Sequence, residues 1–224
     1  MPRIFLLSPA NSGGRRARIV MSGNASFELA QRLRSEQGAP LGDVFAFLSG
    51  LYFRGKLAYA RAFSQSPDPE SPICGSGVFV ITPTAGLRSP DTLVTLAALR
   101  AFAGVEVSAD NPVYREPLER SARTLASEIG DADVVLLGSI ASGKYVEVLH
   151  GIFGDRLVFP ADFVGRGDMS RGGLMLRCVS AQEELQYIPV AGAVRRGRRP
   201  PKLPPLTPAM PAAKRAPRRS GRRR

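Results

Sequence analysis

Short apolar runs alternate with segments of helical spacing along the chain. Four runs are unbroken and apolar enough to predict buried strands, over residues 3–9, 78–83, 132–139 and 156–160. Between them, apolar residues recur every three to four positions. This spacing predicts a short helix ending near Gly104 and helices over residues 25–36, 41–64, 111–130, 143–154 and 170–180. Because strands covered on both faces read as continuous apolar runs, the pattern predicts an α/β fold with a mostly parallel central sheet and helices on both faces.

Several polar and glycine residues indicate where these helices begin and break. Asn24 or Ser26 is expected to cap the first helix, and Ser170 the last. Gly50 and Gly55 are expected to divide the segment 41–64 into pieces, because glycine is unfavourable inside a helix.

The chain has 224 residues, of which 44% are hydrophobic, and this fits one domain with a sizeable core. We place that domain at residues 1–194. The apolar run at the N-terminus has about four residues, shorter than the hydrophobic region of a signal peptide. With only two cysteines, Cys74 and Cys178, the sequence predicts a reducing, cytoplasmic location. The single histidine, His150, and the lack of metal-ligand spacing predict no zinc site, and no motif predicts a cofactor.

The charge is concentrated at the C-terminus. Of 31 Lys and Arg, twelve lie in residues 195–224, which hold no acidic residue, so residues 1–194 carry 19 basic and 19 acidic residues. This Pro- and Arg-rich segment predicts a disordered tail of extended character. One interpretation is an arm that neutralises nucleic-acid phosphates, and the alternative is a segment that only improves solubility. Its candidate contacts are Arg195, Arg196, Arg198, Arg199, Lys214, Arg215, Arg218 and Arg219.

Three polar, glycine-containing loops follow predicted strands. They read "SPANSGG" (8–14), "GSIASGKY" (138–145) and "GRGDMSRGG" (165–173). Ligands of parallel sheets bind beyond the carboxyl ends of the strands, so we expect these loops to meet in one site for a phosphate or a nucleotide. The residues expected to line it are Ser8, Asn11, Lys144, Tyr145, Arg166, Ser170 and Arg171.

Each of these loops also has a simpler interpretation. The first could be a plain connection, because it lacks the spacing of a phosphate-binding loop or a dinucleotide fingerprint. Lys144 could be a solvated surface lysine, and Tyr145 a core aromatic residue. One arginine of the third loop could pair with Asp162 or Asp168 and leave the loop neutral. In an enzyme, one of these two aspartates is the candidate general acid–base group.

The same loops carry a resemblance to the YaaA family of bacterial peroxide-stress resistance proteins. "IFLLSPAN" is similar to the family's "ISPAK" opening, and "GRGDMSRGGLML" resembles its "ARGLMSRFII". "SGKY" (142–145) precedes that loop much as "SDEYF" does in the family. The resemblance implies an α/β core with a basic cleft, binding of double-stranded DNA and a role in limiting iron-driven oxidative damage, without an established catalytic activity.

This chain departs from the family pattern at several points. Asn11 stands where the family has a lysine, and Gly143–Lys144 replaces an acidic pair. Because the body is neutral, DNA contact is expected in the tail. A looser similarity connects the chain to bacterial domains of unknown function.

Two hypotheses of different classes follow from the sequence. The first is a DNA- or nucleic-acid-binding protein of the peroxide-stress kind. The second is an enzyme or a small-ligand binder that acts on a nucleotide or nucleoside at the rim of the sheet. The rim site requires that Asn11, Lys144 and Arg171 lie together.

Overall fold

A computed structural model describes residues 1–141, 143–194 and 197–203. It contains a six-stranded sheet of order β4-β3-β1-β6-β7-β8. The four central strands are parallel: β3 (Val78–Thr82), β1 (Arg3–Leu7), β6 (Asp133–Leu137) and β7 (Leu157–Pro160). They are the four strands that the apolar runs predict. Two short antiparallel strands form the edges, β4 (Gly86–Arg88) and β8 (Tyr187–Pro189). The prediction of an α/β fold with a mostly parallel sheet is confirmed.

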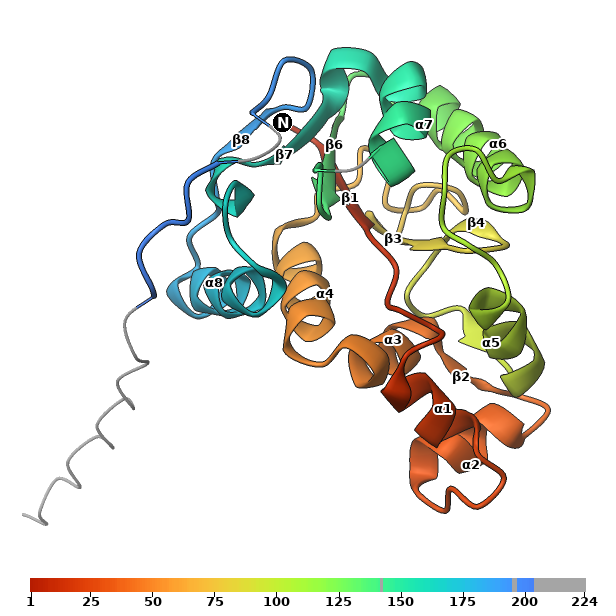
Figure 1. The fold of residues 1–224 in the computed structure, drawn as a ribbon. Helices are drawn as coiled ribbons and strands as arrows, with labels where there is room; N and C mark the ends of the chain where they lie inside the picture. Colours follow the sequence, from red (N-terminus) through yellow and green to blue (C-terminus); the bar gives the residue numbers. More distant parts are fainter. Residues whose placement is uncertain (142, 195–196, 204–224) are drawn as a thin grey trace, which may run out of the picture.

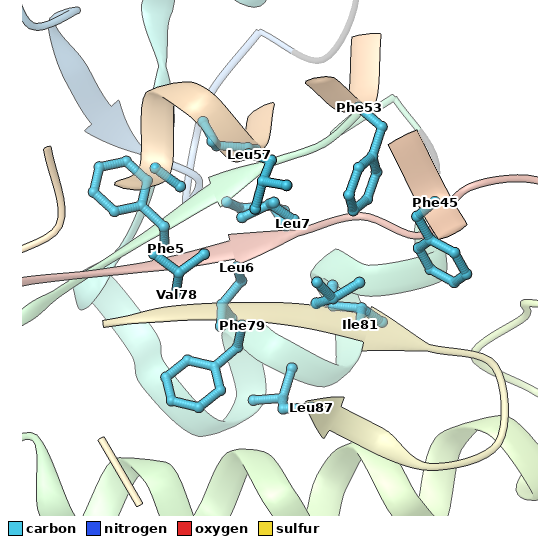
Figure 2. Packing of buried hydrophobic residues seen from close by; sticks show 14 of the residues in the cluster. Phe5, Leu6, Leu7, Phe45, Phe53, Leu57, Val78, Phe79, Ile81 and Leu87 are labelled. Carbon is cyan, nitrogen blue, oxygen red and sulfur yellow. The ribbon is translucent and has the colours of Figure 1, made fainter. Parts of the chain in front are cut away.

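Helices cover both faces of this sheet (Figure 1). One face is covered by α4 (Leu51–Phe63) and α8 (Asp168–Ala181), and the other by α6 (Pro112–Glu128) and α7 (Gly143–Phe153). The alternation of side chains along a strand supplies both halves of the core. Phe5 and Leu7 of β1 face α4, whereas Phe79 of β3 packs with Leu87 on the side of α6 (Figure 2).

A smaller group of elements lies beyond the carboxyl end of β1 (Figure 1). It contains α1 (Arg15–Met21), α2 (Glu28–Arg34), α3 (Leu41–Ser49), α5 (Leu96–Ala103) and a two-stranded ribbon of β2 (Ala39–Pro40) and β5 (Leu93–Val94). Two short 3-10 turns flank β7, at Gly154–Arg156 and Ala161–Phe163. This group brings the end of α5 over the loop that follows β1, and so closes one side of the rim.

The helix signals in the sequence were partly misleading. Gly50 separates α3 from α4 with φ at 63°, as predicted. Gly55, in contrast, lies inside α4. Neither Asn24 nor Ser26 caps α2, because this helix begins after Phe27 without a side-chain cap. The short helix α1 was not predicted from the sequence.

The crossing of α4 and α8 explains Gly55 and one glycine of the loop 165–173. A Cβ on Gly55 would lie 2.7 Å from the carbonyl oxygen of Gly172, and a Cβ on Gly172 would lie 2.8 Å from that of Leu51. Both distances are too short for a real contact, so each helix requires glycine at this point. The backbone of α4 therefore lies directly against Gly172.

The C-terminal segment that the structure describes lies against the same region. Residues 197–203 form neither helix nor strand. The carbonyl of Arg198 is in close contact with Gly165, which has φ at +73°. Arg198 and Arg199 are exposed. The other predicted nucleic-acid contacts of the tail, Arg195, Arg196, Lys214, Arg215, Arg218 and Arg219, lie outside the described residues. No helix in the described ranges has both the length and the apolar character needed to cross a membrane.

Candidate functional site

The order of the parallel strands creates a crevice at their carboxyl ends. The chain leaves β1 toward β3 on one side, and it leaves β6 toward β7 on the other. Because β1 and β6 are neighbours, their outgoing connections diverge, and a ligand crevice is expected between them. A cavity of about 420 Å³ lies here. Its lining is drawn from the loops that follow β1 and β3, from the end of α5 and the loop after it, and from the start of α7: residues 9–13, Pro83, Phe102, Ala103, Val105, Glu106, Val107, Lys144 and Tyr145.

This crevice brings together three of the predicted site residues. Asn11, Lys144 and Tyr145 all line it, and Ser8 is buried directly before its first residue. Asn11 shapes the loop, since its side-chain oxygen accepts a hydrogen bond of 3.0 Å from the Gly13 amide. The buried Ser12 hydroxyl also belongs to this loop, and it has no hydrogen-bond partner among the described residues. A buried hydroxyl without a partner is costly to the fold.

The other predicted residues, Arg166, Ser170 and Arg171, are not part of this lining. Arg166 turns back on its own loop, where it donates to the Asp162 carbonyl at 2.9 Å and to the Ser170 hydroxyl at 3.4 Å. The expectation that Ser170 caps the last helix is wrong. α8 begins at Asp168 after Gly167, which supplies no side-chain hydrogen bond, so Ser170 lies within the first turn.

Arg171 is engaged within the protein. Its Nε and Nη2 donate to the carbonyl of Phe163 at 3.2 and 3.0 Å, and its Nη1 lies 3.7 Å from the Asp168 carboxylate. The guanidinium also lies over the Phe163 ring, with 5.4 Å between Cζ and the centroid. The interpretation in which one arginine pairs with an aspartate of its own loop therefore describes Arg171, whose side chain is only 12% exposed.

Lys56 is the functional candidate that sequence reasoning missed. It lies on α4 and is almost fully buried at the end of β1. Its Nζ donates to the Ser8 carbonyl at 2.6 Å and lies 2.9 Å from the Ser8 hydroxyl. The rings of Tyr52 and Phe53 flank the amine, with centroids 4.5 and 4.8 Å away. The available signal was its position on the apolar stripe of the helix, four residues after Tyr52.

Burial changes the acidity of this lysine. Desolvation is the largest cause and lowers the pKa of Lys56 from 10.5 to about 7. From α8, the Asp168 carboxylate acts in the opposite direction, and the Arg171 guanidinium lowers the pKa. Lys56 therefore loses its proton at a lower pH than an exposed lysine does.

Asp168 connects the loop 165–173 to the crevice electrostatically. Burial raises the pKa of Tyr145 to about 12, and the Asp168 carboxylate contributes to that rise. Burial likewise raises the pKa of Tyr52 to about 12, where Arg171 acts to lower it and Asp168 to raise it. Asp168 and Arg171 of the third loop therefore shift the pKa values of Tyr52 and Lys56 through their charges. The arginines of this loop do not line the cavity.

A second hollow lies away from the strand ends. Its volume is about 630 Å³, and it lies between the β3–β4 hairpin and α6, with Arg88 and Arg120 among its lining. None of the predicted site residues belongs to it.

A comparison of the chain with family models, with curated proteins and with solved structures gives no match. The resemblance to the YaaA family stays a prediction. The chemistry of the crevice has to be inferred from its own geometry.

Proposed function

We propose that the crevice between β1 and β6 binds a small phosphate-bearing molecule of the nucleotide class. The observation that carries this proposal is the convergence of Asn11, Ser12 and Lys144 in one cavity at the point where the strand order reverses. Its volume of about 420 Å³ lies within the range of known small-molecule sites.

Different residues of the lining can contact the phosphate, the base and the sugar of such a ligand. Lys144 lies in the first turn of α7, where its charge adds to the positive end of the helix dipole and favours a phosphate. Tyr145 offers an aromatic side chain to a base, and Glu106 offers a carboxylate to a sugar hydroxyl.

Titration with adenosine monophosphate and with adenosine tests this proposal. We expect Lys144→Ala to weaken binding of the monophosphate by about tenfold and binding of the nucleoside far less, because the lysine contacts the phosphate. Arg120→Ala, which removes a charge from the second hollow, is the matched control and should leave both affinities unchanged. Equal affinity of the wild-type protein and the Lys144→Ala variant for the monophosphate would overturn the proposal.

A second function, nucleic-acid binding, is favoured by the charge distribution. All of the excess positive charge lies in residues 195–224, while residues 1–194 are neutral in sum. We propose that this segment binds double-stranded DNA through its phosphates. A role in peroxide stress belongs to this proposal, on the strength of the family resemblance alone. The two free cysteines fit the reducing cytoplasm as the location.

Neutralising the tail tests the second function without shortening the chain. With the twelve basic residues of 195–224 replaced by Gln, we expect weaker DNA binding and a smaller dependence of affinity on salt, because fewer counterions are released. Binding to duplex DNA is measured across a salt series, with thermal melting as the check on folding. An unchanged affinity and salt slope would place the DNA contact on the neutral body.

A further inference from the structure

The pairing of Ser8 with Lys56 has the geometry of a nucleophile and its base. A serine hydroxyl becomes nucleophilic when a nearby base takes its proton, and lysine is that base in the Ser–Lys variants of the catalytic triad. In this chain Nζ of Lys56 lies 2.9 Å from Oγ of Ser8, within the range for direct proton transfer. The Ser8 carbonyl, 2.6 Å from the same Nζ, fixes the position of the amine.

The surroundings bury this pair, and the crevice begins at the residue that follows Ser8. Ser8 and Lys56 are both buried, so bulk water does not solvate the ammonium form. Gly138, which follows β6, lies beside Ser8. A Cβ at this position would be 3.3 Å from Oγ of Ser8, so a larger residue would cover the hydroxyl. Pro9, the next residue after Ser8, already lines the crevice.

We propose that Ser8 is a nucleophile that accepts an acyl group from an ester whose leaving alcohol occupies the crevice, with Lys56 as its base. This inference rests on the proposed function only for the identity of that alcohol, a nucleotide- or nucleoside-like molecule.

The proposed reaction has two balanced steps. Oγ of Ser8 attacks the ester carbonyl, the Oγ–C bond forms, and the proton moves from Oγ to the uncharged Nζ of Lys56. The bond to the leaving oxygen then breaks, and Lys56 returns the proton to that oxygen, which leaves as an alcohol. Water hydrolyses the acyl-Ser8 intermediate in the same manner, with Lys56 taking a proton from the water and Oγ recovering it.

A fluorophosphonate probe tests the pair without a known substrate. The probe reacts with an activated serine by forming an O–P bond while fluoride leaves and Lys56 takes the proton. In the folded wild-type protein we expect a mass increase on the peptide that contains Ser8. The labelling rate should rise about tenfold per pH unit below pH 7 and level off above it, because only the uncharged amine is a base. The charged and titratable groups that act on Lys56 are Tyr52 on its own helix and Asp168 and Arg171 from α8.

Three variants complete the test. Ser8→Ala should remove the label, and Lys56→Met should slow labelling by at least about tenfold and remove its pH dependence. Ser89→Ala, in the loop after β4, should label as the wild type does. If Ser8→Ala or Lys56→Met fails to melt cooperatively, the test rests on the wild-type protein. The labelled residue and the pH dependence of its labelling then decide whether the inference holds. Absence of label on Ser8 between about pH 6 and about pH 9, or a rate that does not change with pH, overturns the inference.

The same experiment separates this inference from the proposed function. Because the probe contains no nucleotide, failure to label while adenosine monophosphate still binds overturns only the Ser8–Lys56 pair. Labelling of Ser8 in a protein that does not bind the monophosphate supports the pair and counts against the crevice as a nucleotide site.

Discussion

At the scale of single residues, two neighbouring glycines of α8 have different roles. Gly172 is in close contact with the backbone of α4, whereas the nearest side-chain atom to a Cβ on Gly173 is Leu203 Cδ1 at 3.8 Å, an ordinary contact. The sequence motif contains both glycines side by side, and only the packing of the two helices distinguishes them.

We predict opposite effects when each of the two glycines becomes alanine. Gly172→Ala should lower the free energy of unfolding by about 1–3 kcal/mol, because the new Cβ pushes α8 away from α4. Gly173→Ala should raise it by up to about 1 kcal/mol, because alanine is the better helix former and has space there. Urea denaturation of both variants measures these changes. Equal effects on stability would show that α4 and α8 do not cross at Gly172.

Lys56 shows the limit of reasoning from single residues. Lysine is normally solvated, so its identity predicts a surface position. Its burial depends on α8 closing over α4 at Gly55 and Gly172, a contact between segments more than a hundred residues apart. The position of Asn11 and Lys144 in one cavity, in contrast, was predictable, because they follow strands whose parallel order places their ends on one edge.

At the scale of elements, the length of a strand decided whether the sequence could predict it. The four parallel strands have four or five residues each and are almost wholly buried, and each was predicted from its apolar run. The edge strands β4 and β8 have three residues, and β2 and β5 have two. Runs this short have no measurable period, and their pairing depends on neighbours that are distant in sequence.

The edge strand β8 is held to the sheet by a network of side-chain hydrogen bonds. The hydroxyls of Tyr59 on α4 and Tyr187 on β8 lie 2.7 Å apart, and the Leu185 amide donates to Tyr59 at 2.7 Å. Tyr187 donates to Glu184, which also pairs with Arg3 of β1. This network fastens the C-terminal strand to the first strand and to α4.

We predict that Tyr59→Phe destabilises the protein by about 1–3 kcal/mol, because it leaves the partly buried Leu185 amide without its acceptor. Tyr114→Phe is the matched control. The Tyr114 hydroxyl is buried and has no hydrogen-bond partner among the described residues, so its removal should cost little or stabilise the fold. Chemical denaturation compares the two variants. A larger loss for Tyr114→Phe than for Tyr59→Phe would contradict the network described here.

At the scale of the whole molecule, the crevice and the excess of positive charge lie in different regions of the chain. The folded domain is neutral in sum and carries the crevice, while the C-terminal segment carries the excess of positive charge. We therefore propose that a small ligand binds in the crevice and that nucleic acid contacts the C-terminal segment.

We propose that the ligand site lies at the carboxyl ends of β1 and β6. Two-dimensional amide NMR spectra of the full-length protein during titration with adenosine monophosphate test it most directly. We expect the shifted signals to belong to residues 10–13 and 143–145, at the loop after β1 and the start of α7. Shifts confined to the surroundings of Arg88 and Arg120, in the second hollow, would contradict it, as would a spectrum that does not change.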